Sequence, residues 1–99
     1  MKTLLTLFVL LFTSSLFANC TSGDCVNGSG IYSFDDGDEY VGEFESSEYH
    51  GQGTYIFSNG DKYVGEFINN KRTGYGEFTN KRGKIKKGQW LNDELIKKY

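Results

Sequence analysis

The chain has 99 residues, which is enough for one small domain. It carries 11 Lys and Arg against 13 Asp and Glu, so its formal net charge is −2. This slightly acidic balance argues against a nucleic-acid partner, because proteins that bind nucleic acid neutralise phosphates with an excess of bases.

Residues 1–18, MKTLLTLFVLLFTSSLFA, differ in composition from the rest of the chain. Lys2 precedes an apolar run from Leu4 to Phe12, and the small residue Ala18 ends the segment. This is the layout of a cleavable export signal, and the apolar run is too short to favour a membrane anchor. The sequence therefore predicts cleavage after Ala18 and a mature chain that is secreted, periplasmic or held in the cell envelope.

Two cysteines, Cys20 and Cys25, follow in the segment 19–27. An even number of cysteines in an exported chain predicts a disulfide, and the four intervening residues can make the turn that it needs. Two thiols alone do not make a zinc site. Lipid attachment at Cys20 is an alternative that would leave Cys25 single, but Asn19 stands where that processing prefers a Gly or Ala. We expect residues 19–27 to form a disulfide-stapled lead-in.

The mature chain repeats itself every 23 residues. Residues 51–67, GQGTYIFSNGDKYVGEF, match residues 28–44, GSGIYSFDDGDEYVGEF, at 11 of 17 positions. Residues 74–90, GYGEFTNKRGKIKKGQW, keep only the four glycines of the same frame, and Phe78 replaces Tyr55 and Trp90 replaces Phe67 there. A fixed period of this length is typical of a stacked repeat protein.

Each repeat reads as a β-hairpin. In the middle repeat, residues 54–57 and 62–67 alternate between two faces, and Asn59-Gly60 between them favours a tight turn. The polar stretches 45–50 and 68–73 are expected to turn the chain into the next hairpin. The fold class is therefore all-β, with about three hairpins stacked along the chain.

Glycines and aromatic residues fall on the same face of each hairpin. Glycine inside a strand normally weakens it, so its recurrence opposite aromatic rings indicates that a ring lies flat over the bare backbone. We predict an aromatic ladder whose main role is structural, with ligand binding on its surface as the alternative. The repeat glycines are Gly28, Gly30, Gly42, Gly51, Gly53, Gly65, Gly74, Gly76 and Gly88. The ladder comprises Tyr32, Phe34, Tyr40, Phe44, Tyr55, Phe57, Tyr63, Phe67, Phe78 and Trp90.

Charge is distributed unevenly along the chain. Residues 19–70 hold ten acids against the single base Lys62, whereas residues 71–99 hold nine bases against three acids. Solvated faces explain this most simply, and head-to-tail self-association is an alternative. The bases of the third repeat read as a cap that discourages further strand pairing, or as a contact for anionic lipid or another polyanion. They are Lys81, Arg82, Lys84, Lys86 and Lys87.

Residues 91–99 follow the last repeat. Asn92 and Asp93 could begin a short helix there, with Lys97 and Lys98 near its end. We expect this C-terminal cap to pack over the end of the sheet.

The sequence resembles the MORN repeat family. The resemblance rests on residues 40–44 (YVGEF), 51–55 (GQGTY) and 59–67 (NGDKYVGEF), and it covers residues 28–90. It implies an elongated single-layer antiparallel sheet that is used mostly as an interaction scaffold, in a small exported protein of bacterial type. Some members of the family are linked to anionic phospholipids and others form dimers end to end. Lys86 departs from the family pattern, which has Tyr at this position. This departure leaves open whether the third hairpin is complete.

Residues that could do chemistry are few, and no cofactor is expected. His50 is the only histidine and reads as a turn residue, and Asp35, Asp36 and Asp38 read as turn acids because they lack the frame of a calcium loop. We therefore expect no enzyme, but a scaffold that binds an unidentified protein partner. Binding of anionic lipid through the basic third is one alternative, and a carbohydrate-binding or hydrolytic surface is another.

Overall fold

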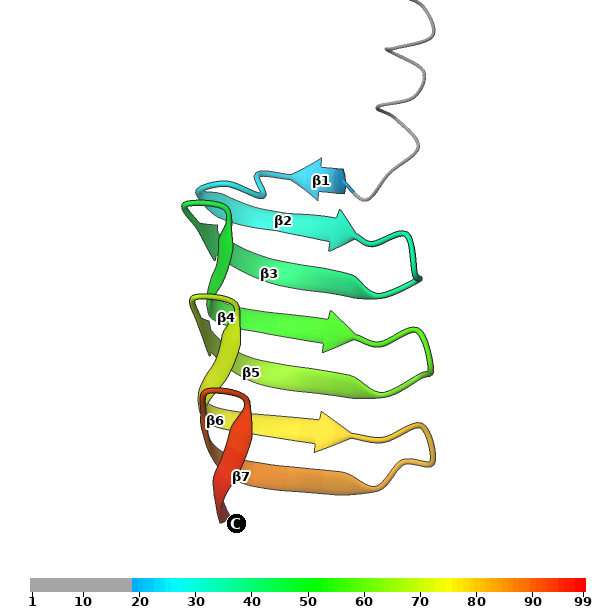
Figure 1. The fold of residues 1–99 in the computed structure, drawn as a ribbon, viewed down its shortest axis with the longest axis vertical. Helices are drawn as coiled ribbons and strands as arrows, with labels where there is room; N and C mark the ends of the chain where they lie inside the picture. Colours follow the sequence, from blue (N-terminus) through cyan, green and yellow to red (C-terminus); the bar gives the residue numbers. More distant parts are fainter. Residues whose placement is uncertain (1–18) are drawn as a thin grey trace, which may run out of the picture.

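The computed structural model describes residues 19–99, which form one antiparallel sheet of eight strands (Figure 1). The export signal predicted for residues 1–18 lies outside these residues. The strands pair in chain order, each with the next. They are β1 (Asn19–Gly23), β2 (Gly28–Ser33), β3 (Glu39–Glu45), β4 (Glu48–Ile56), β5 (Lys62–Ile68), β6 (Lys71–Thr79), β7 (Ile85–Leu91) and β8 (Glu94–Lys98).

The three predicted hairpins are β2–β3, β4–β5 and β6–β7, and the all-β expectation is confirmed. The third hairpin is complete, with pairs running from Gly74 and Trp90 to Thr79 and Ile85. Lys86 is tolerated in it because an exposed lysine needs no ring partner at the last full strand of the sheet.

Two expectations are wrong. The stretches 45–50 and 68–73 are not simple connections, because β4 begins at Glu48 and β6 at Lys71 and both pair backwards with the preceding strand. Residues 94–98 form a strand rather than a helix, since β8 pairs with β7. Both errors have one physical cause: a two-residue turn suffices to reverse the chain at each of these places.

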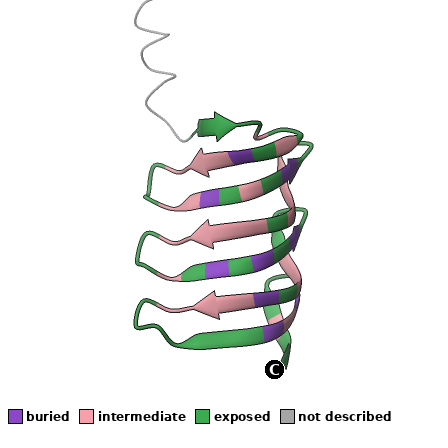
Figure 2. Ribbon diagram, turned by 180° about the vertical axis from the view of Figure 1, so that it is seen from behind, coloured by how far each residue is buried: buried purple, intermediate pink, exposed green. Residues whose placement is uncertain are grey.

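The sheet is buried on one side only. Along β5 burial alternates strictly, with Tyr63, Gly65 and Phe67 buried and the residues between them exposed. This alternation places the predicted aromatic ladder on one face (Figure 2). The buried hydrophobic residues are Tyr40, Phe44, Tyr63, Phe67 and Trp90.

Rings lie over glycine backbone as predicted. A Cβ atom added to Gly53 would lie 2.6 Å from both Cε1 and Cζ of the Tyr40 ring, and Gly76 would meet the Tyr63 ring in the same way. The Tyr40 hydroxyl donates a hydrogen bond to the backbone oxygen of Glu43 at 2.8 Å. Each tyrosine thus covers the first strand of the hairpin that follows it, and this contact stacks the repeats.

Cys20 and Cys25 form the predicted disulfide, with an S–S distance of 2.11 Å. Its place in the stack resembles that of a tyrosine ring. A Cβ added to Gly30 would lie 2.9 Å from Cys25 Sγ, so the sulfur covers the glycine of the first repeat. The disulfide therefore closes the stack at β1 and β2.

Candidate functional site

Three two-residue turns curl over one face of the sheet (Figure 1). These curled turns join β3 to β4, β5 to β6 and β7 to β8, and all six of their residues have a φ between 49° and 73°. Two successive residues of positive φ make a type I′ turn, whose twist matches that of paired strands. The curled turns are Ser46–Ser47, Asn69–Asn70 and Asn92–Asp93.

Side chains of the curled turns tie one repeat to the next. Asn70 Oδ1 accepts a hydrogen bond from the backbone N–H of Tyr49 at 2.9 Å, and Asp93 Oδ1 accepts one from Arg72 at the same distance. Because each bond spans about one repeat, the turns form a second column that faces the sheet.

Tyr49 and Arg72 occupy equivalent positions in this column, 23 residues apart. The Tyr49 ring stacks on the Tyr40 ring, with centroids 3.9 Å apart and planes 8° apart. The Arg72 guanidinium carbon lies 5.7 Å from the Tyr63 ring centroid and 4.9 Å from that of Trp90. A cation thus takes the place of a ring over the equivalent tyrosine.

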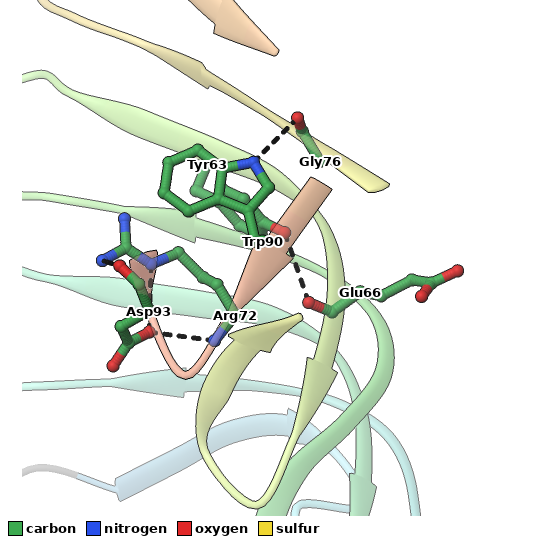
Figure 3. A network of polar contacts seen from close by, with 6 residues as sticks. All are labelled: Tyr63, Glu66, Arg72, Gly76, Trp90 and Asp93. Carbon is green, nitrogen blue, oxygen red and sulfur yellow. Dashed lines mark hydrogen bonds and ion pairs between the residues drawn. The ribbon is translucent and has the colours of Figure 1, made fainter. Parts of the chain in front are cut away.

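Asp93 holds Arg72 in this position, beside Trp90 (Figure 3). Its Nε donates to Asp93 Oδ1 at 3.0 Å, and its Nη2 donates to the Asp93 backbone oxygen at 3.0 Å. Partial burial raises the pKa of the Asp93 carboxyl, but the hydrogen bonds and charge of Arg72 outweigh it and leave that pKa below its usual value. The carboxylate therefore stays charged near neutral pH.

One network of contacting rings runs through the repeats. The ring centroids of Phe34 and Tyr55 lie 6.2 Å apart and join the first hairpin to the second. Those of Phe57 and Phe78 lie 6.1 Å apart and join the second hairpin to the third. The network contains all ten predicted ladder residues and adds Tyr49, which the sequence analysis missed. Tyr75 lies outside it, stacked on Tyr99 at 6.0 Å.

Between the sheet and the curled turns lie two adjoining hollows of about 510 and 360 Å³. They share Phe34, Tyr49 and Asn70, and together we call them the aromatic groove. The first is also lined by Cys25, Val26, Tyr32, Phe44 and Ser47. The second is also lined by Tyr55, Phe57, Phe67, Arg72 and Asp93.

The hairpin loops opposite the curled turns carry acids at the first two repeats. Asp38 accepts from the Tyr55 hydroxyl at 2.8 Å through Oδ2 and from the Ser58 backbone N–H at 2.7 Å through Oδ1. Asp61 likewise accepts from the backbone N–H of Lys81 at 2.9 Å. We call the carboxylates of these two loops the acidic rim, which comprises Asp35, Asp36, Asp38 and Asp61.

The structure divides the bases proposed for anion contact. Lys81, Arg82 and Lys84 are exposed in the loop between β6 and β7. Lys86 shares the register of Phe78 and hence the aromatic face, whereas Lys87 pairs with Glu77 and points to the opposite face. Only the three loop bases form one group.

His50 lies within strand β4 and not in a turn as predicted, and the acid beside it is Glu45. The His50 Nε2 atom lies 3.1 Å from Glu45 Oε1, and both side chains are substantially exposed. Within residues 19–99, no group of three or more His, Cys, Asp or Glu could hold a metal ion. Over the same residues, no helix is long and apolar enough to cross a membrane.

Alkaline pH is expected to destabilise the fold. Burial raises the pKa of Tyr49 and of Tyr63 to about 12, against 10.0 for a free tyrosine. Because the folded state favours the neutral phenol, this stability is complete below pH 10 and is lost as the pH rises from about 10 to 12. We expect tyrosinate absorbance and loss of the β-sheet circular dichroism signal to appear together in that window. Ionisation of most tyrosines near pH 10 with the sheet intact would contradict this.

The fold and groove define a class: a β-hairpin repeat protein whose units stack through rings laid over glycines. The chain belongs to the MORN repeat family, whose model, described as MORN repeat, matches residues 27–39, 40–62 and 63–84. A search of curated proteins returned no significant match. MORN repeats are commonly non-catalytic modules that bind proteins or membranes.

Proposed function

We propose that this protein is a non-catalytic, exported scaffold that binds a partner protein in the aromatic groove. The observation that carries the proposal is the groove itself, in which rings such as Phe34, Tyr55 and Phe57 remain only half-buried. Aromatic residues and arginine are the side chains most enriched at the energetic centres of protein interfaces.

The walls of the groove are held in place by backbone pairing and hydrogen bonds, which favours binding. The floor of the groove is a continuous ladder of paired strands, and its second wall is fixed by the bonds between Asn70 and Tyr49 and between Asp93 and Arg72. A pre-organised site loses little conformational entropy when a partner docks. A partner can therefore gain affinity from a modest contact area.

Site-specific photocrosslinking tests this proposal. A photoreactive p-benzoylphenylalanine in place of Phe57 would sit in the groove, and the same residue in place of Val64 would sit on the opposite, exposed face of the next strand. Irradiated in the organism that makes the protein, the Phe57 variant is expected to give one saturable crosslinked protein that the Val64 variant does not give. Equal crosslinking from both positions, or none from Phe57, would refute groove binding.

Export is part of the proposal and has its own support. The Cys20–Cys25 disulfide fits an oxidising compartment. Intact-mass analysis of the protein from its source, with and without reductant, is expected to show a chain that begins at Asn19 and gains two hydrogens on reduction. A retained leader or an added lipid mass at Cys20 would overturn this, the latter in favour of a lipid-anchored form.

The loop bases favour a second candidate function, contact with an anionic lipid surface. Lys81, Arg82 and Lys84 are all exposed in a single loop, where each could contribute about 1 kcal/mol near such a surface. Co-sedimentation with phosphatidylserine vesicles should then fall steeply with salt and vanish when these residues become Gln. Unchanged co-sedimentation of the Gln variant would exclude the loop as the contact.

A further inference from the structure

We infer that the aromatic groove is built for a basic, proline-rich peptide segment in the polyproline II conformation. The inference rests on the proposed function, because it names the chemistry of the protein segment that the groove would hold. Three features of the groove carry it: its spacing, its ring surface and its charge.

The spacing of the groove matches an extended proline-rich chain. Equivalent rings such as Phe34 and Phe57 stand two strands apart in the stack, which is about 9.5 Å at the usual strand separation. One turn of polyproline II takes three residues and rises about 9.3 Å. Such a segment running along the stack would present the same face to each successive hairpin.

The ring surface suits proline. Polyproline II segments dock into grooves lined with aromatic side chains, and they lose little entropy on binding because the helix is already formed. Here Phe34 and Phe57 line one wall and Tyr49 the other, so flat rings flank the path on both sides. The Tyr49 hydroxyl and the Asn70 side-chain NH2 group are the donors available there for peptide carbonyls, because the Asn70 side-chain oxygen already accepts from the Tyr49 backbone N–H.

The charge beside the groove calls for a cationic ligand. The acidic rim borders the groove: Asp38 accepts a hydrogen bond from the hydroxyl of Tyr55, which lines the groove, and Asp35 and Asp36 directly follow Phe34 in the chain. The one guanidinium that lines the groove, that of Arg72, is already paired with Asp93. A peptide carrying Arg or Lys beside its prolines would therefore meet unneutralised carboxylates such as Asp35 and Asp36.

The chain itself supplies matched variants for a test. Asn80 occupies the position of Phe34 and Phe57 in the third repeat and makes the same loop hydrogen bond from its backbone N–H. Phe34→Asn with Phe57→Asn therefore removes two rings and puts in their place a residue that this loop position already holds in the chain, where its side chain also accepts from the N–H groups of Arg82 and Lys84. Ser58 and Asn59 occupy the positions of Asp35 and Asp36. Asp35→Ser with Asp36→Asn therefore removes two charges and keeps the side-chain oxygen that accepts from residue 38.

The probes are three labelled twelve-residue peptides, measured by fluorescence anisotropy with the oxidised 19–99 chain. The first alternates prolines with arginines, the second replaces its arginines with glutamates, and the third replaces its prolines with alanines. We expect the first to bind at least tenfold more tightly than either of the others. Its affinity should fall more than tenfold in the ring variant, and severalfold in the charge variant, with a weaker salt dependence.

A random peptide library displayed against the same chain separates the two proposals. Groove-dependent peptides enriched in proline and basic residues would support the inference. Groove-dependent peptides without that enrichment would overturn it and leave protein binding in place. If no peptide depends on the groove, both proposals fall. Both also fall if a neutral glycan binds the chain and its binding is all that the ring variant loses. Should the ring variant not fold by circular dichroism, the single variant Phe57→Asn replaces it in every arm.

Discussion

A Tyr40→Ala variant is expected to be largely unfolded at room temperature. Tyr40 is fully buried, contacts Phe44, Tyr49 and Phe67, and covers Gly53 of the next hairpin. Removing a buried aromatic side chain costs about 3 to 5 kcal/mol. That is comparable with the whole stability of a domain of this size, which is on the order of 4 to 12 kcal/mol.

Tyr40→Phe is the control, because it keeps the ring and removes only the hydroxyl. The lost hydrogen bond to the Glu43 backbone oxygen leaves that acceptor without its tyrosine partner, at a cost of about 1 kcal/mol. Urea unfolding followed by circular dichroism compares the two variants. Equal and small losses for Ala and Phe would show that the ring does not hold the hairpins together.

Gly53→Ala is expected to destabilise the protein by about 1 to 3 kcal/mol, which is the usual cost of overpacking a core. In an ordinary strand the same change would stabilise by roughly 0.5 to 1 kcal/mol, because alanine loses less entropy on folding. The sign reverses here because the new methyl group would meet the Tyr40 ring, which is buried and fixed by its stack with Tyr49.

The comparison for this prediction is Gly83→Ala. Gly83 has a φ of +89° and no atom within 4 Å of an added Cβ, so its substitution strains only the backbone. The cost at Gly83 should not depend on any ring. A gain in stability for Gly53→Ala in thermal or urea unfolding would refute the close approach of the ring.

The repeat frame was predictable because every repeat needs a glycine where a ring lies over the backbone, so the same residue types recur at the same positions. Gly53 beneath Tyr40 and Gly76 beneath Tyr63 admit no other side chain, so the 23-residue period stays visible in the sequence. The hairpin loops were predictable for a similar reason, since Asn59-Gly60 is a strong turn signal.

The curled turns were not predictable in this way. Ser46 and Ser47 both adopt a positive φ although neither is glycine, and a pair of serines is a weak sequence signal for a type I′ turn. The second column, formed by the curled turns with Tyr49 and Arg72, was not predicted for a different reason. Tyr49 and Arg72 are 23 residues apart and each covers a tyrosine, but they share no residue type. The same position of the period holds Val26 before them and Leu95 after them. A search for periodic positions irrespective of residue type would have found it.

The groove was only half predictable from the sequence. The sheet wall follows from the period-two alternation that puts Tyr55 and Phe57 on one face of the strand, which is the basis for expecting a ligand on the ladder. The opposite wall depends on the curled turns, so neither the hollow nor the position of Arg72 and Asp93 within it could be derived. The charge of the rim was visible in the sequence, but its place beside the rings was not.

A double-mutant cycle between Gly53→Ala and Tyr40→Leu measures the ring-over-glycine contact most directly, with leucine chosen to keep the core partly filled. The free energy of unfolding of the wild type, both single variants and the double variant would be taken from urea titrations. We predict that Gly53→Ala costs at least 1 kcal/mol less in the Tyr40→Leu background, whereas the cost of Gly83→Ala is unchanged there. Additive effects of Gly53→Ala and Tyr40→Leu would contradict stacking through rings laid over glycines.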